Sequence, residues 1–427
     1  MKTVDTTYFI NRNRELRRLV GRITNRGQCS ALVGEPRVGK TSILHYLAAK
    51  TWQDNFGEVE YQLHFAYFDL QTIGSQFTQA NFWEQAFYQL DDGKLFAPEK
   101  SISRAYNSCR ESGFSTFMLE RFLLQLGEEK IRLVLLLDEF DSLLFHPVLN
   151  RGEFFGSLRS LASRCDSLAM VIASRQSLSS LNTSTQELSR TGSPFFNIFE
   201  EITLGAFDEK TTQEFLSLSQ KRLSSGDHKY LVRIAGGHPF FLQIARSSLL
   251  DEYEEKTKGE SLRWQKTGER LLDQAKHIMD DTWRLWTPEM KQAFVTIALD
   301  EMPVILGEKQ FDIPALVESL ADLAPEVRSL KARGFIRDDK LLSSGFAVGA
   351  EVMLWWLADQ LIIALRSNDE LGAWLRSQQW DGTFFKKKEK DQLVKAAYSV
   401  GNFLKGGVET FITAAAEGVG KGISGPK

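Results

Sequence analysis

The chain has 427 residues, which is enough for roughly two to four domains. Its 43% hydrophobic and 25% charged residues are ordinary for a globular protein, and a formal net charge of −3 excludes a strong overall attraction to nucleic acid. The three cysteines show no C-x-x-C spacing and the six histidines form no ligand cluster, which excludes a disulfide framework and a zinc site.

We expect a cytoplasmic protein from these features. Residues 1–18 are polar and charged, which is unlike a signal peptide. The apolar run at 346–365 comes closest to membrane-spanning length, but Glu351 and Asp359 interrupt it.

The first predicted elements are an amphipathic helix that begins within residues 8–16 and a strand–loop–helix segment after it. Residues 30–33 are small and apolar, which predicts a buried strand, and residues 41–50 carry apolar side chains at helical spacing. The loop between them fits the P-loop pattern G-x-x-x-x-G-K-[ST]. We therefore expect ATP or ADP to contact this loop through Gly34, Glu35, Pro36, Arg37, Val38, Gly39, Lys40, Thr41 and Ser42.

Each key residue of this loop has a chemical reason to be there. Gly34 and Gly39 allow the tight turn that points backbone N–H groups at phosphate oxygens. The helix N-terminus behind them adds partial positive charge. Lys40 is expected to reach the β- and γ-phosphates, and the Thr41 hydroxyl is expected to hold Mg²⁺.

A strand is predicted over residues 59–71 and helices over 81–90 and 115–126, with a loop at 91–113. The aliphatic run from Ile131 to Leu137 then predicts a strand buried on both faces, and it ends in acids. Asp138 fits the acid that holds Mg²⁺, and Glu139 is placed to orient or deprotonate the attacking water. Asp141 supports that water or pairs with a basic neighbour.

A helix is predicted at 153–164 and a third buried strand at 167–173. Arg175 follows that strand, where a basic residue can contact the γ-phosphate; a surface arginine is the alternative of equal weight. Arg159 and Arg164 are candidates for arginine fingers in trans, although helix-surface roles are the commoner explanation.

From residue 208 the pattern becomes helical, at 211–219, 228–235 and 239–250, after a strand that ends the connection at 192–207. The turn Gly-Gly-His-Pro at 236–239 is explained locally by a helix end followed by a helix that opens with proline. A highly charged helix or linker follows at 251–270.

Three further helices at 288–299, 313–320 and 325–333, a hairpin turn and a closing helix at 346–365 predict a winged helix. Residues 281–365 hold 8 basic and 13 acidic residues, so we expect this module to contact protein and not the DNA backbone.

The last segment is basic and carries an apolar stripe at spacings of four and three from Leu393 to Val419. Interior glycines weaken such a helix in water, so it needs a partner surface. Three partners are open: the protein's own body, another copy of the chain, or an anionic membrane surface, which would make the protein peripherally membrane-bound when active.

Several motifs, in this order, resemble those of STAND NTPases, the signal-transduction ATPases related to NB-ARC proteins, and most of all their prokaryotic AAA-type members. The similarity covers roughly residues 8–365. The motifs are Phe-Ile-Asn-Arg-Asn-Arg-Glu-Leu (9–16), the P-loop (34–42), Leu-Leu-Leu-Asp-Glu-Phe-Asp (135–141), Val-Ile-Ala-Ser-Arg (171–175), the run at 193–207 and Gly-Gly-His-Pro-Phe-Phe-Leu-Gln (236–243).

The resemblance implies an α/β P-loop core with a parallel sheet, a helical lid and a winged helix, closed on ADP and opened by ATP. It makes Arg175 the sensor-1 arginine, places Pro239 near adenine and His238 near the phosphates, and puts Ile10 and Asn11 beside the base. We therefore expect a core at 1–207, a lid at 208–275, a winged helix at 280–366 and a tail at 367–427.

The sequence also lacks some features of the family. Only about sixty residues follow the winged helix, too few for the family's repeat sensor, so a partner protein is expected to supply the sensor or effector. No Met-His-Asp is present at the winged helix. No guanine-specific Asn-Lys-x-Asp is evident either, and ATP over GTP rests on the resemblance.

The functional prediction is a slowly hydrolysing ATP switch that forms homo-oligomers on activation, in prokaryotic defence or regulated cell death. One alternative is an AAA+ ATPase of the origin-recognition or transposition type that acts on DNA through its winged helix. A second alternative is a scaffold that holds nucleotide without turnover; the presence of both Asp138 and Glu139 argues against it.

Overall fold

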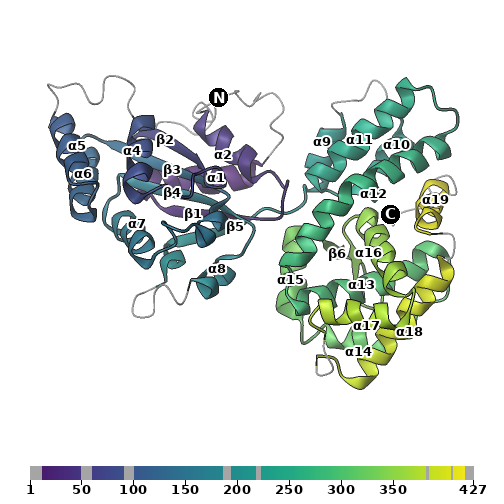
Figure 1. The fold of residues 1–427 in the computed structure, drawn as a ribbon. Helices are drawn as coiled ribbons and strands as arrows, with labels where there is room; N and C mark the ends of the chain where they lie inside the picture. Colours follow the sequence, from purple (N-terminus) through teal and green to yellow (C-terminus); the bar gives the residue numbers. More distant parts are fainter. Residues whose placement is uncertain are drawn as a thin grey trace. The chain divides into compact units, whose positions relative to one another are not determined.

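The computed structural model divides into two compact units (Figure 1). The first comprises Met1–Glu35 and Gly39–Leu204, and the second Pro36–Val38 and Gly205–Lys427. The residues described are 12–49, 60–90, 101–185, 194–217, 223–380, 384–404 and 407–418.

The first unit is built on a five-stranded sheet in the order β2-β3-β4-β1-β5, and the pairings between neighbours are all parallel. Every residue of the three central strands is buried, because helices pack on the sheet. This confirms the predicted α/β class. The strands are β1 (Cys29–Val33), β2 (Gln62–Asp69), β3 (Ile131–Asp138), β4 (Leu168–Ser174) and β5 (Phe199–Thr203).

The helices predicted for this unit are observed, whereas those at Ser101–Glu111 and Leu178–Ser184 were not predicted. Residues 91–113 were predicted as loop, but Ser101–Glu111 is helix α5. Its apolar face is short, with Ile102 and Cys109 buried seven residues apart among polar neighbours, and the loop prediction was wrong for that reason. The others are α1 (Asn13–Arg26), α2 (Lys40–Ala48), α4 (Gln79–Leu90), α6 (Thr116–Glu128), α7 (Gly152–Arg164), α8 (Leu178–Ser184) and the 3-10 helices η2 (Phe140–Phe145) and η4 (Phe195–Ile198).

The second unit is largely helical, and local capping chemistry fixes several of its helix ends. The Thr287 side chain accepts from the Met290 N–H and Pro288 occupies the first turn, which starts α13. The helices are α9 (Glu209–Ser217), α10 (Ser225–Ala235), α11 (Pro239–Glu254), α12 (Glu260–Leu285), α13 (Pro288–Leu306), α14 (Pro314–Ser319), α15 (Ala324–Arg333), α16 (Glu351–Ala364), α17 (Asn368–Ser377), α18 (Lys387–Phe403) and α19 (Glu409–Gly418).

Helices α13 to α15 and a two-stranded antiparallel hairpin have the element order of a winged helix. The hairpin is β6 (Ile336–Asp338) and β7 (Phe346–Val348). Two acids of α13 hold it: Ser344 N donates to Asp300 at 2.7 Å and Val348 N donates to Glu301 at 2.6 Å. The helix predicted over 346–365 is therefore corrected to a strand at 346–348 and a helix from Glu351.

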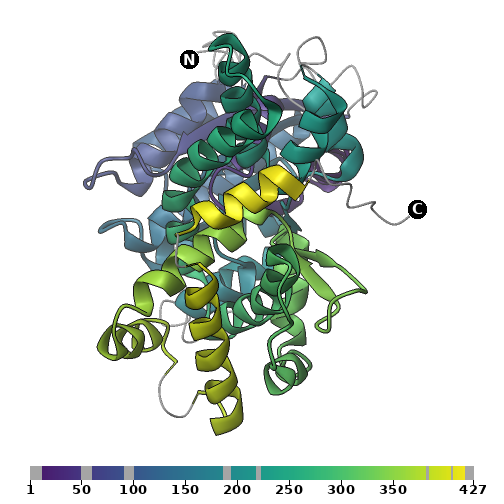
Figure 2. The same cartoon turned by 90° about the vertical axis from the view of Figure 1, so that its right-hand side faces the viewer.

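The apolar stripe of the tail packs inside the second unit. Leu393, Val400, Phe411 and Ala415 are buried, on the two separate helices α18 and α19. Helix α19 packs against α12 and α13, and Figure 2 shows it as the bright yellow helix. Gly268 of α12 permits this approach, because a Cβ there would meet Ile412 at 2.8 Å. Of the three partners considered, the protein's own body is the one observed for the described part of the tail.

Five glycines lie where distant segments of the second unit cross with their backbones in contact. A Cβ on Gly237 would lie 2.2 Å from the carbonyl oxygen of Phe207, and one on Gly349 would lie 2.2 Å from that of Gly334. No side chain fits at such distances, so glycine is required by the packing. The five glycines of this crossing are Gly205, Gly236, Gly237, Gly334 and Gly349.

Candidate nucleotide-binding site

The P-loop connects β1 to α2, and its lysine is folded back on the loop. Lys40 Nζ donates to the backbone oxygens of Gly34 at 2.7 Å and Glu35 at 3.0 Å. Lys40 is only 5% exposed, and this burial lowers the pKa of its ammonium while Glu139 and Glu35 oppose the shift. Gly39 has a φ of 106°, a conformation that side chains disfavour, so the second motif glycine is required by the backbone.

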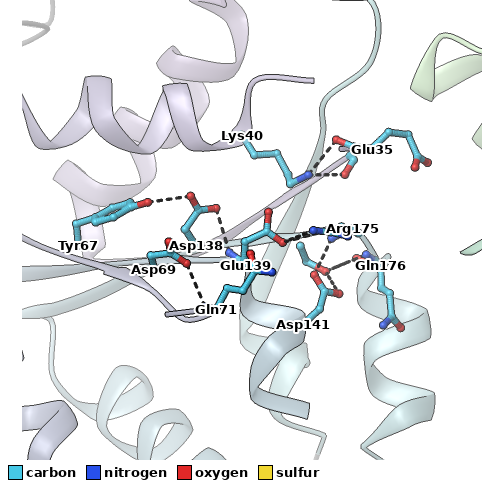
Figure 3. A network of polar contacts seen from close by, with 12 residues as sticks. Glu35, Lys40, Tyr67, Asp69, Gln71, Asp138, Glu139, Asp141, Arg175 and Gln176 are labelled. Carbon is cyan, nitrogen blue, oxygen red and sulfur yellow. Dashed lines mark hydrogen bonds and ion pairs between the residues drawn. The ribbon is translucent and has the colours of Figure 1, made fainter. Parts of the chain in front are cut away.

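The carboxyl ends of β2, β3 and β4 bring a set of polar side chains together beside this loop (Figure 3). Asp138, the last residue of β3, is 2% exposed. Tyr67 Oη donates to its Oδ2 at 3.0 Å and the backbone N–H of Glu139 donates to its Oδ1 at 3.0 Å. Both carboxylate oxygens are thus held by donors, and the carboxylate is oriented before any ligand arrives.

Glu139 and Arg175 form an ion pair across the ends of β3 and β4. The guanidinium donates to Glu139 Oε2 through Nη2 at 3.0 Å and through Nε at 3.2 Å. Both side chains are partly accessible, at 34% for Arg175 and 24% for Glu139. Glu139 has a φ of 49°, a left-handed conformation that is uncommon for a residue with a side chain. Such backbone strain is found preferentially at functional sites.

Asp141 holds the end of β4 in place. Its Oδ1 accepts from Ser174 Oγ at 2.9 Å and its Oδ2 accepts from the backbone N–H of Arg175 at 2.9 Å. Asp141 thus contacts Arg175 through the backbone N–H, while the basic side chain of Arg175 pairs with Glu139. Asp141 therefore fixes the backbone position from which the Arg175 side chain extends.

Two residues of the site were missed in the sequence analysis, Tyr67 and Asp69 at the end of β2. Strand β2 pairs in register with β3 so that Asp69 lies opposite Asp138. The signal was a polar residue at the carboxyl end of a predicted parallel strand, where α/β sheets bind ligands. Burial, followed by the neighbouring Asp138 carboxylate, raises the pKa of Tyr67, so its hydroxyl stays protonated and donates.

Four other residues were predicted to contact the nucleotide. Ile10 and Asn11 lie outside the described residues. His238 precedes α11 and Pro239 opens it, both in the second unit. The His238 ring is stacked on Phe241 with centroids 4.2 Å apart.

The finger candidates Arg159 and Arg164 both belong to α7. Arg164 pairs with Glu120 of α6 at 3.3 Å on the surface, which supports the structural explanation for it.

The oxygen atoms at this site suit Mg²⁺ as ligands. Mg²⁺ prefers oxygen ligands and keeps several waters, so the Thr41 hydroxyl and the Asp138 carboxylate would be sufficient protein ligands beside nucleotide phosphates. Among the residues described, no group of three or more His, Cys, Asp or Glu side chains forms an all-protein metal site. In the same part of the chain, no helix is long and apolar enough to cross a membrane.

Comparison with known proteins agrees with this geometry. The profile of a family described as AAA-like domains matches residues 1–311, so the chain belongs to that family. It is similar in fold to a Walker-type ATPase of Pyrococcus abyssi, with a TM-score of 0.51 and 16% identity over 82% of this chain and 96% of that one. The fold is therefore that of a P-loop ATPase.

Two further solved structures are similar at lower scores. The ORC2 protein of Aeropyrum pernix has a TM-score of 0.49 and 12% identity over 87% of this chain and 98% of its own. A STAND protein of Pyrococcus horikoshii with a tetratricopeptide repeat sensor has 0.32 and 13% over 91% of this chain and 50% of its own. A search of curated proteins gave no match.

Proposed function

We propose that this chain is a STAND-type switch that binds ATP, hydrolyses it slowly and changes its assembly with nucleotide state. The observation that carries the proposal is the ion pair between Arg175 and Glu139. It joins the arginine expected to sense the γ-phosphate to the acid expected to activate water. Phosphate oxygens compete for a guanidinium, so binding of ATP would release Glu139 for catalysis, whereas ADP would leave the pair intact.

The other residues take the roles that their chemistry allows. Lys40 exchanges its two loop carbonyls for phosphate oxygens when a nucleotide enters. Thr41 and Asp138 would hold Mg²⁺, which would neutralise the charge that develops on the phosphates. Glu139 then accepts a proton from the attacking water.

The second unit supplies the remaining parts of the proposal. Pro239 is proposed to lie near adenine and His238 near the phosphates. Ile10 and Asn11 of the first unit are proposed to lie beside the base. A homo-oligomer on activation and a partner protein that senses the trigger complete the proposed switch. Its setting would be the cytoplasm, in prokaryotic defence or regulated cell death.

The test is the mass in solution, measured by light scattering with ADP and then with ATP. Glu139→Gln should remain loaded with ATP and form a larger, defined oligomer, because hydrolysis no longer resets the site. Lys40→Ala should lose nucleotide binding and keep one mass under both conditions. Normal ATP turnover by Glu139→Gln would remove Glu139 from its role, and retained ATP affinity in Lys40→Ala would refute the P-loop assignment.

A second candidate function is DNA binding through the winged helix, and local charge favours it. Residues 324–348, which span α15 and the hairpin, hold five of the eight basic residues of 281–365 but only three of its thirteen acids. Arg328, Lys340 and Arg337 are exposed there. DNA binding would be supported if duplex affinity fell steeply with salt and Arg328→Ala with Lys340→Ala flattened that dependence.

A further inference from the structure

Tyr67 links the two elements that carry the proposed magnesium ligands. It lies on β2, two residues before the strand ends, and its hydroxyl reaches across to Asp138 on β3 at 3.0 Å. Its ring faces the imidazole of His45 on α2, with centroids 4.5 Å apart (the Tyr67 hydroxyl contact is drawn in Figure 3). His45 follows Thr41 by four residues on that helix, so both side chains project from the same helical face.

The contact controls the orientation of Asp138. A carboxylate at a strand end can rotate about its Cα–Cβ and Cβ–Cγ bonds, and two donors limit that rotation here. The Glu139 N–H holds Oδ1 and is part of the backbone, so it cannot be lost by side-chain change. The Tyr67 hydroxyl holds Oδ2, and it is the donor among these two that a substitution removes.

The type of donor matters as well as its position. A hydroxyl is neutral, so it orients Asp138 without cancelling the negative charge that attracts a cation. A lysine or arginine in its place would form an ion pair and compete with the metal. A hydrogen bond from a neighbour to a metal-binding carboxylate also fits the general pattern in which outer residues tune metal affinity.

We propose that Tyr67 is a positioning residue that holds the Asp138 carboxylate ready to receive Mg²⁺ together with Thr41. The inference rests on the proposed function, because it concerns the metal of the same nucleotide site. The proposed role of Tyr67 is exerted through its hydrogen bond to Asp138.

The test measures metal affinity separately from nucleotide affinity. Mn²⁺ is titrated by electron paramagnetic resonance into the protein saturated with a non-hydrolysable ATP analogue, and nucleotide affinity is measured in EDTA. Tyr67→Phe keeps the ring against His45 and removes only the hydroxyl. It should weaken Mn²⁺ binding by about tenfold or more and leave metal-free nucleotide affinity unchanged.

Two controls make the outcomes distinct. Tyr61→Phe makes the same change just before the opposite end of β2 and should leave Mn²⁺ affinity unchanged. Asp138→Asn should weaken Mn²⁺ binding more than Tyr67→Phe does. If Asp138→Asn weakens Mn²⁺ binding and Tyr67→Phe does not, the inference about Tyr67 is overturned and the proposed function is not affected. If neither variant has an effect, the metal site of the proposed function itself is wrong.

Discussion

Arg175 is held at both ends, by Asp141 at its backbone and by Glu139 at its guanidinium. We predict that Arg175→Ala lowers the rate of ATP hydrolysis by about ten- to a thousandfold, because a charged donor to the transferring phosphate is lost. ADP affinity should be unchanged. Single-turnover kinetics and an ADP titration check both parts, with the exposed Arg121→Ala of α6 as a charge-matched control. Hydrolysis at the normal rate would leave Arg175 without a role in sensing phosphate.

Glu301 gives a second prediction, on the dependence of stability on pH. Burial raises the pKa of Glu301 to about 7, while the hydrogen bond from Val348 N works in the opposite direction. Since the pKa of Glu301 in the folded protein lies above the ordinary glutamate value of 4.5, the folded protein binds this proton more tightly than the unfolded chain does. The stability it contributes is present below pH 4.5 and is lost as pH rises through 7.

Glu301→Gln should therefore match the wild type at pH 5 and exceed its unfolding free energy by on the order of 1 to 3 kcal/mol at pH 8. The glutamine oxygen still accepts from Val348 N, so the hairpin contact is retained. Urea denaturation at the two pH values checks this, with the exposed Glu308→Gln as control. A difference that does not change with pH would contradict the assignment.

At the scale of elements, the crossing of glycines makes a steric prediction. Gly349→Ala should lower the unfolding free energy of the second unit by about 1 to 3 kcal/mol, because its Cβ meets a backbone oxygen that cannot move aside. Gly156→Ala on α7 has nothing within 4 Å of its Cβ and should be neutral or slightly stabilising. Thermal unfolding of both variants provides the comparison, and equal effects would mean that the crossing is loosely packed.

Elements with a clear local sequence pattern could be predicted, whereas elements whose bounds depend on tertiary contacts could not. Strand β3 follows from an unbroken aliphatic run that ends in acids, and the P-loop follows from its glycines. The helix start at 346 was wrong because β7 and α16 are both apolar and only tertiary contacts separate them. Tyr67 was missed because its partner Asp138 is set by the register between two strands that lie some seventy residues apart, which no local pattern records.

At the scale of the whole molecule, the tail is part of the second unit. Deleting 386–427 should lower its stability by several kcal/mol, since buried residues such as Phe411 and Ile412 each contribute about 1.5 to 3 kcal/mol. Calorimetry of the truncated protein beside the full chain checks this. If the protein stayed stable without α18 and α19, the tail would be available for contacts with other partners.

The crossing of glycines also constrains the order in which the chain can fold. The segment that contains Gly205 contacts Ala332, and Gly236 contacts Gly349. Each of these early segments therefore gains its packing partner only after a much later part of the chain has been synthesised. Synthesis of the later segments takes on the order of ten seconds, and until then the segments around Gly205 and Gly236 lack the backbone contacts of this crossing. The second unit should consequently fold in one late step once the hairpin has emerged, and fragments that stop before it should remain unfolded.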